Sequence, residues 1–196
     1  MKTSSQEYTN LLQQSYLPGR SLYLKCCIYP RILKRFKRGD VLDMGCGFGE
    51  FLKFLMRKKI SCCGIDSNEN HVMLCNQMGL PSMVGDVLNF QPNKKFQNAV
   101  LDNVLEHLNL DEINSFFQNM KNVLMLDGRL FVIVPCLKGQ KRDPTHKTLV
   151  TERVIQEVAI RNHMNLVEVV NIPTPFEFIG KYFYLQMKMF VLDMVQ

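Results

Sequence analysis

The sequence has no apolar run long enough to cross a membrane, and its start, MKTSSQEYTN, lacks the apolar core of a signal peptide. Its seven cysteines form no C-x-x-C pair and stand at no histidine ligand spacing. An odd number of cysteines without a framework is typical of reduced thiols, so neither a disulfide scaffold nor a zinc site is predicted. We therefore expect a cytoplasmic protein without a bound metal.

The composition is that of a single folded unit. Hydrophobic residues make up 46% of the 196 positions and charged residues 21%. Glycine and proline are present in modest numbers, which argues against disorder. This length allows one sizeable hydrophobic core and hardly two.

Positive charge is concentrated in two places, although the net charge is only +6. Such clusters favour an anionic partner, such as nucleic acid, a phosphorylated sugar or a lipid head group. They are equally typical of a solvated basic face, and one phenylalanine among them is too little for a base-stacking platform. The clusters are Arg31, Lys34, Arg35, Lys37 and Arg38, and Lys138, Lys141, Arg142 and Lys147.

The most informative stretch is VLDMGCGFGE, from Val41 to Glu50. An apolar run leads to Asp43, glycines then alternate, and apolar residues at helical spacing follow. This pattern predicts a buried strand, a tight glycine turn and a helix start. Glycines in such a turn let the main chain pack against a nucleoside and aim its N–H groups at it.

The acids in this stretch indicate which nucleoside would bind. Glu50 occupies the sixth position of G-x-G-x-x-G, where its carboxylate would repel a pyrophosphate at the helix N-terminus, and the G-K-[ST] of a P-loop is absent. A positively charged ligand is favoured instead. The pattern D-x-G-C-G-x-G resembles motif I of the class I S-adenosylmethionine (SAM) dependent methyltransferases. That resemblance implies that SAM is held by Asp43, Gly45, Cys46, Gly47 and Gly49.

Two further segments fit a nucleoside site. Asp66 ends a β-compatible run at a distance from the glycine loop that suits an acid binding ribose hydroxyls. Asp66 or Ser67 also fits the N-cap of a following helix, and ribose binding by Asp66 is compatible with capping by Ser67 or Asn68. The sequence G-D-hydrophobic resembles the family's third motif. By that resemblance, Asp86 reaches the adenine amino group and the Val87 N–H faces a ring nitrogen.

A second family signature follows the strand predicted at 96–101. The letters V-L-E-H end at His107, and the resemblance implies that Asp102 and Asn103 line the methyl-transfer side of SAM. His107 is a candidate general base, because an imidazole titrates near neutral pH. The alternative is that Glu106 and His107 only brace the loop.

The segment D-P-T-H-K-T, within a polar stretch at 137–148, provides the other candidates for acid–base chemistry. It resembles a D-x-x-H segment of methyltransferases that act on small molecules or sugars. Asp143 and His146 would orient a substrate hydroxyl and take its proton. Alternatively, Asp143 and Thr145 only cap a turn. Cys136 follows strand 5 and is interpreted as incidental.

Together these patterns predict a doubly wound α/β fold with a mostly parallel, seven-stranded, Rossmann-like sheet. Residues 1–38 are expected to form an N-terminal helical cap, part of the same domain, and residues 39–196 the methyltransferase domain. The prediction includes helices at 6–17, 21–36, 111–126 and 151–161 and a turn at Asp127–Gly128. It also includes a last strand at 185–194 that pairs antiparallel at the sheet edge. Possible pocket residues in the cap are Tyr8, Tyr16, Arg20 and Tyr23.

The predicted function is transfer of a methyl group from SAM to a small-molecule acceptor, most simply a hydroxyl. An anionic acceptor would fit the basic clusters. Alternatives are an RNA methyltransferase, a non-catalytic scaffold with a SAM fold and an NAD dehydrogenase, which Glu50 disfavours. The sequence predicts neither the identity of the acceptor nor the oligomeric state.

Overall fold

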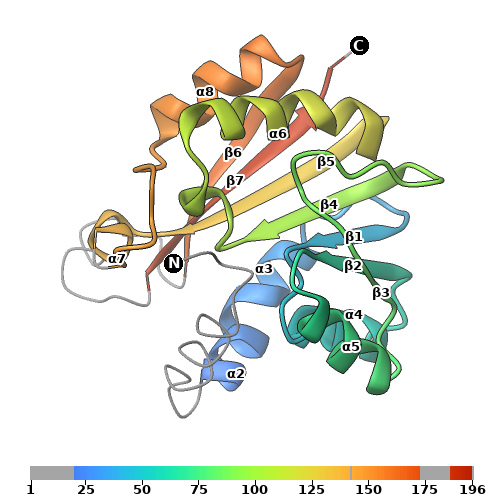
Figure 1. The fold of residues 1–196 in the computed structure, drawn as a ribbon. Helices are drawn as coiled ribbons and strands as arrows, with labels where there is room; N and C mark the ends of the chain where they lie inside the picture. Colours follow the sequence, from blue (N-terminus) through green and yellow to red (C-terminus); the bar gives the residue numbers. More distant parts are fainter. Residues whose placement is uncertain (1–19, 142, 173–185, 196) are drawn as a thin grey trace.

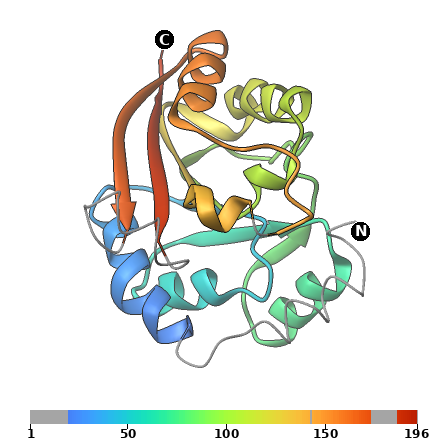
Figure 2. The ribbon, with the colours of Figure 1, turned by 90° about the vertical axis from the view of Figure 1, so that its left-hand side faces the viewer.

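The computed structural model describes residues 20–141, 143–172 and 186–195, drawn in colour in Figure 1, with only the backbone described at Arg20. Its sheet has seven strands in the order β3-β2-β1-β4-β5-β7-β6, between two layers of helices (Figures 1 and 2). This confirms the predicted doubly wound α/β fold. The strands are β1 Val41–Met44, β2 Cys62–Asp66, β3 Ser82–Val84, β4 Phe96–Asp102, β5 Leu124–Pro135, β6 Met164–Ile172 and β7 Met187–Met194.

The helices lie on both faces of this sheet. Figure 1 shows α6 and α8 on one face and α2 to α5 on the other. Within the described ranges no helix is long and apolar enough to cross a bilayer. The helices are α2 Arg20–Tyr23, α3 Tyr29–Leu33, α4 Glu50–Arg57, α5 Glu69–Gln77, α6 Leu110–Val123, α7 Leu137–Gln140 and α8 Glu152–Arg161, with a π-helix η1 Leu24–Ile28 and a 3-10 helix η2 Leu105–His107.

The strand pairing indicates where in the sheet a ligand would bind. Strand β1 pairs in parallel with both β2 and β4, so the order reverses beside β1. In open α/β sheets ligands bind outside the carboxyl ends of the strands at such a switch point. The glycine loop begins there, directly after β1. Strand β7 runs antiparallel, as predicted for the last strand, but it lies between β5 and β6 and not at the sheet edge as predicted.

The core follows from the alternation of side chains along the central strands. Ala99 and Leu101 of β4 pack with the apolar faces of α6 and α8, whereas Val100 packs on the other face with α3 and α4. Both faces of β4 are therefore buried, although three of its seven residues are polar. The segment from η1 to α3 packs into the same cluster as β1. The boundary predicted at residue 38 stays a prediction.

Local capping explains where the later helices begin. Asn109 and Glu112 form a reciprocal capping box at the start of α6, with bonds of 2.9 and 2.7 Å. The Thr151 side chain accepts from the Val154 N–H at the start of α8. Both predicted helices are thus confirmed, and α6 ends three residues earlier than the predicted Leu126.

Three predicted elements differ in the structure. The helix expected at 21–36 is three short pieces, with Pro30 in the first turn of α3, where its missing N–H is harmless. Strand β5 begins at Leu124, and the turn expected at Asp127–Gly128 is an irregularity within it. The polar stretch after β5 contains the short helix α7. The helix predicted at 6–17 lies outside the described residues.

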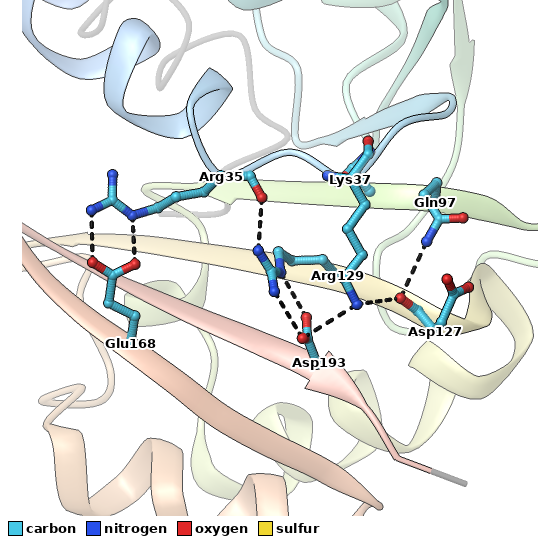
Figure 3. A network of polar contacts seen from close by, with 8 residues as sticks. Arg35, Lys37, Gln97, Asp127, Arg129, Glu168 and Asp193 are labelled. Atoms are coloured by element: carbon cyan, nitrogen blue, oxygen red, sulfur yellow. Dashed lines mark hydrogen bonds and ion pairs between the residues drawn. The ribbon is translucent and has the colours of Figure 1, made fainter.

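The first basic cluster joins an ion-pair network at the amino-terminal end of β5 (Figure 3). Arg35 binds Glu168 through two bonds of 2.6 and 2.7 Å. Arg129 binds Asp193 in the same way, and Lys37 lies 3.2 Å from that carboxylate. This network ties the segment before β1 to β5, β6 and β7, at the end of the sheet away from the glycine loop. The contacts of Arg35 and Lys37 therefore agree better with a solvated basic face than with a role in binding substrate.

Candidate functional site

The glycine loop after β1 has the backbone that only glycine adopts easily. Gly45, Gly47 and Gly49 have φ angles of 80°, 51° and 72°, all in the left-handed region. The alternation in the sequence therefore reflects three left-handed positions in one turn. Gly49 is the N-cap of α4, so Glu50 stands in the first turn of that helix, as predicted.

The three glycines differ in what surrounds them. A Cβ at Gly45 would lie 2.5 Å from Cγ2 of Val104, and one at Gly49 would lie 2.6 Å from Leu80. Packing therefore excludes a side chain at these two positions. A Cβ at Gly47 would meet nothing within 4 Å. Gly47 is thus the point where bare main chain faces open space, and where a ligand could lie directly against it.

The N–H groups of this loop turn inward, contrary to the expectation that they face a ligand. Gly45 and Cys46 both donate to the Ile65 carbonyl, at 2.8 and 2.9 Å. Gly47 donates to Oδ2 of Asp66 at 2.8 Å, and Gly49 donates to the Cys46 carbonyl. A phosphate needs such donors, and here they already have partners. The loop therefore suits a ligand that is itself cationic or a hydrogen-bond donor.

Three carboxylates lie near one another at the carboxyl ends of β1, β2 and β4. Asp43 is 3% exposed, and its burial, together with the charges of Asp102 and Asp66, raises its pKa well above the usual value. Asp66 binds the Gly47 N–H through one oxygen and the Asn68 N–H through the other, which joins the glycine loop to the start of α5. Clustered acids that repel one another are stabilised by a cation between them.

The other predicted cofactor residues lie around this acidic group. Asn103 follows Asp102 with a left-handed φ of 55° and donates to its carboxylate at 2.7 Å. Such a conformation in a non-glycine residue is a feature of functional sites. The Gly85 N–H donates to the Asp66 carbonyl, which brings the third motif beside Asp66, the residue predicted to bind ribose. Asp86 is exposed, and its carboxylate accepts from the Leu88 N–H.

Three predicted residues have side chains that serve other purposes or face elsewhere. The Cys46 side chain packs beneath the loop with Leu52, Cys75 and Leu80, and its hydrogen bond to Cys75, together with burial, raises its pKa. Val87 is buried in the main core. Ser67 is exposed, and the N-cap of α5 is Asn68. Any contact of Cys46 or Val87 with a cofactor would thus use the main chain.

The structure brings the two separate acid–base candidates together. The carbonyl of Glu106 accepts from the N–H groups of Lys147 and Thr148, at 2.9 and 3.2 Å. These bonds hold the D-P-T-H segment against the V-L-E-H segment. The rings of His107 and His146 consequently lie edge to face, with centroids 4.7 Å apart. We call Glu106, His107, Asp143, Thr145 and His146 the histidine cluster.

Each histidine in this cluster is held through Nδ1. Thr145 Oγ1 donates to Asp143 at 2.6 Å, so its oxygen is the acceptor for His107 Nδ1 at 3.1 Å. His146 Nδ1 lies 2.7 Å from the Gln140 carbonyl, which can only accept. Both neutral rings therefore carry the proton on Nδ1 and the lone pair on Nε2. Burial, and then His146, lower the pKa of His107, which favours its neutral form.

Glu106 is the most deeply buried acid in this cluster. It is 0% exposed, and burial raises its pKa to about 8. Neither carboxylate oxygen has a hydrogen-bond partner among the described residues. The charge of Asp102 contributes to the raised pKa of both Glu106 and Asp43. The charge of Asp102, a member of the acidic group, therefore also acts on the histidine cluster.

Asp143 acts within the cluster as a positioning residue. Its Oδ1 accepts from both the N–H and the hydroxyl of Thr145, at 2.8 and 2.6 Å. This matches the turn-capping alternative, and the same contacts orient His107 through Thr145. Of the predicted cap residues, Tyr23 is half-buried, and burial raises its pKa to about 12, with Asp102 among the charges that act on it. Tyr8 and Tyr16 lie outside the described residues, and the Arg20 side chain is not described.

A cavity of about 590 Å³ opens beside the cluster, at the end of β5. Gln140 lines it and also holds His146 through its carbonyl. Basic side chains of Lys138, Arg153 and Lys188 line it together with Glu152. Sequence patterns did not single out Glu106, Thr145 or Gln140 as site residues. The V-L-E-H motif contains Glu106, but its burial without a partner becomes visible only in the fold.

Comparison with known proteins gives a consistent result. The sequence matches the family model for the methyltransferase domain over residues 20–172. A search of curated proteins found no significant match to this chain.

Several solved structures share the fold. A SAM-dependent methyltransferase from Archaeoglobus fulgidus superposes with a TM-score of 0.76 at 19% identity, covering 95% of this chain and 99% of that one. The magnesium protoporphyrin IX methyltransferase of Synechocystis, with bound SAH, gives 0.71 at 13% identity, covering 98% and 96%. The 1,6-didemethyltoxoflavin-N1-methyltransferase of Burkholderia thailandensis, with its substrate and S-adenosylhomocysteine, gives 0.68 at 16% identity, covering 99% and 85%.

Proposed function

We propose, from the premise that this chain belongs to the methyltransferase domain family, that it moves a methyl group from SAM to a hydroxyl of a small-molecule acceptor. The observation that best supports SAM as the cofactor is the acidic group, Asp43, Asp66 and Asp102, beside Gly47. SAM has a sulfonium and an ammonium and no phosphate, so it suits a loop whose N–H groups are already bonded and whose neighbours are carboxylates. The structures of the Synechocystis and Burkholderia thailandensis enzymes contain S-adenosylhomocysteine, which is SAM without its methyl group.

Each cofactor residue has a distinct part in this proposal. Gly47 would let the main chain lie against the ligand, because no side chain occupies that space. Asp66 holds the loop through its two hydrogen bonds and retains lone pairs for ribose hydroxyls. Asp43 and Asp102 would face the cationic end. The exposed Asp86 beside β2 would reach the adenine amino group.

Methyl transfer from SAM requires alignment of the acceptor, the methyl group and the sulfur more than covalent catalysis by the protein. When bound, SAM supplies a methyl group already activated by the sulfonium, so that an oxygen nucleophile takes the carbon and the electron pair stays on sulfur. The remaining difficulty is the proton of the acceptor hydroxyl. The histidine cluster stands one loop beyond Asp102 and carries ring lone pairs on Nε2 of His107 and His146. It is therefore the group that would activate the hydroxyl, with Asp143 orienting His107 through Thr145.

The cavity beside the cluster is the proposed acceptor site. Its lysines and arginine favour an acceptor with negative charge, although only Lys138 among them belongs to the second basic cluster. The solved neighbours include an N1-methyltransferase, so the fold accommodates other acceptor atoms. The proposal of a hydroxyl rests on the cluster, because an amine acceptor needs less help with its proton.

Calorimetric titration with SAM and with S-adenosylhomocysteine tests the cofactor directly. We expect saturable binding of both, and no competing binding of NADH. Heat from NADH alone would revive the dehydrogenase alternative, and an intact fold that binds neither cofactor would favour the scaffold. The first basic cluster offers less support for an RNA methyltransferase, because two of its five residues, Arg35 and Lys37, are engaged in the ion-pair network. RNA binding that falls steeply with salt would favour it nevertheless.

A further inference from the structure

We propose that Glu106, His107 and His146 bind a divalent transition-metal ion. Each residue offers one ligand atom, and these three atoms lie within 4.8 Å of one another. An ion central to three such atoms is at most about 2.8 Å from each, and a contraction of about 0.7 Å reaches the Zn–N distance of about 2.1 Å. Side-chain rotations supply shifts of that size. The sequence predicted no metal, because these ligands come from two segments far apart in the chain.

The buried carboxylate is the observation that points to a cation. Glu106 is fully buried and both its oxygens lack a hydrogen bond within the described structure, while His146 Nε2 lies 3.9 Å from Oε1. A buried acid without a partner is costly, and proteins retain one where it binds something. The 3.9 Å gap is too long for a hydrogen bond. It is a suitable separation for two atoms that share an ion.

The histidine contacts supply the second part of the argument. A metal-binding histidine usually donates its other ring N–H to a carbonyl or carboxylate, which fixes the tautomer and turns the free nitrogen to the metal. His146 has this arrangement through the Gln140 carbonyl at 2.7 Å. His107 has it through Thr145, whose hydroxyl is in turn bonded to Asp143. Both Nε2 lone pairs are thus directed by the outer contacts, as at a metal centre.

The ligand set indicates the kind of ion and its use. Two imidazoles and one carboxylate suit Zn²⁺, Co²⁺, Mn²⁺ or Fe²⁺ and leave coordination positions open. With both Nε2 lone pairs bound to the ion, the ion would replace the imidazole base: an acceptor oxygen on an open position would lose its proton to solvent more easily, because the ion lowers its pKa. This use of the site rests on the proposed function, whereas metal binding itself does not. The acceptor class is then a small molecule whose hydroxyl can also act as a metal ligand.

Titration of the metal-free full chain with Co²⁺ tests the site. We expect one equivalent to bind with visible d–d absorption bands, and chelator to reverse the binding. Glu106→Gln and His146→Gln should each weaken the affinity by at least about 100-fold, and Thr145→Val by about 10–100-fold through His107. The matched control is His163→Asn, which removes an exposed histidine outside the cluster at a left-handed position that asparagine tolerates.

Circular dichroism establishes whether the variants fold. If they do not, electron spin echo spectroscopy of Cu²⁺ bound to the wild-type chain gives an independent reading, with modulation from two histidine nitrogens expected. The absence of histidine nitrogen would overturn the proposal. So would equal Co²⁺ affinity in the wild-type chain and in folded His146→Gln.

Titration with SAM separates this proposal from the proposed function. A chain that binds SAM but no Co²⁺ refutes the metal site alone. A chain that binds Co²⁺ through His146 but no SAM refutes the proposed function and leaves the metal site standing.

Discussion

Replacing Gly47 by alanine separates the strain of the glycine loop from its role as a ligand surface. The residue has a φ of 51°, and a Cβ there would meet no atom within 4 Å. The left-handed conformation costs alanine roughly 1–2 kcal/mol, of which about 0.4–1 kcal/mol is offset because alanine restricts the unfolded chain. We therefore expect the free energy of unfolding to fall by about 1 kcal/mol. For a chain of this size, the melting temperature should fall by about 2–4 °C.

Binding should respond far more strongly than stability. The new methyl group would occupy the space in which the proposed ligand lies against the main chain. We expect the dissociation constant for S-adenosylhomocysteine, measured by calorimetry, to rise at least tenfold, which corresponds to about 1.4 kcal/mol.

Gly79→Ala is the matched control for this variant. Gly79 has a φ of 72° and equally open surroundings, but it follows α5 and contributes nothing to the proposed site. Its alanine variant should lose similar stability and keep wild-type affinity. If Gly47→Ala also kept wild-type affinity, the ligand would not lie on the glycine loop and the reasoning would be refuted.

Three further results are expected. Asp66→Ala leaves two N–H groups without an acceptor, so chemical denaturation should show a loss of about 1–3 kcal/mol, together with weaker SAM binding; a variant as stable as wild type would contradict these bonds. Gly45→Ala should unfold more easily than Gly47→Ala, and Val104→Ala should restore part of the loss in the double variant, since Val104 Cγ2 occupies the Cβ position. Burial raises the pKa of Asp193, but the hydrogen bonds and charges of Arg129 and Lys37 together outweigh it and the net pKa is lowered. The stability from this pair is present above the unfolded pKa of about 4 and lost as the pH falls through the folded pKa, so unfolding free energy should fall less steeply below pH ~4 in Asp193→Asn.

The sequence predicted the parts of this protein that local pattern determines. The apolar run, alternating glycines and helical spacing around Gly47 describe one continuous strand–turn–helix unit, and the structure confirms it. The helices α6 and α8 were predicted for the same reason, α6 from its apolar residues at helical spacing and α8 from the cap at Thr151. The last strand was predicted from the alternation of its own residues, but its place between β5 and β6 was not.

The remainder depended on contacts between distant segments. No pattern in the sequence joins Glu106 to His146, because their meeting requires the loop after β5 to bond to the carbonyl of Glu106. The inward N–H groups of Gly45, Cys46 and Gly47 depend on Ile65 and Asp66, which lie on the next strand. The basic cluster before β1 likewise became structural only once Glu168 and Asp193 were placed beside it.

The acids around Asp102 link the two proposed sites through one electric field. Burial and then neighbouring acids raise the pKa of Asp43 on one side, and burial raises that of Glu106 on the other, with Asp102 contributing to both. A negative field of this kind attracts cations and repels an anionic acceptor. An acceptor drawn to the basic cavity would therefore meet this repulsion at the reaction centre unless positive charge were already bound there. The sulfonium and the ion held by the histidine cluster would each supply that charge, so the acidic group and the basic cavity are compatible parts of one site.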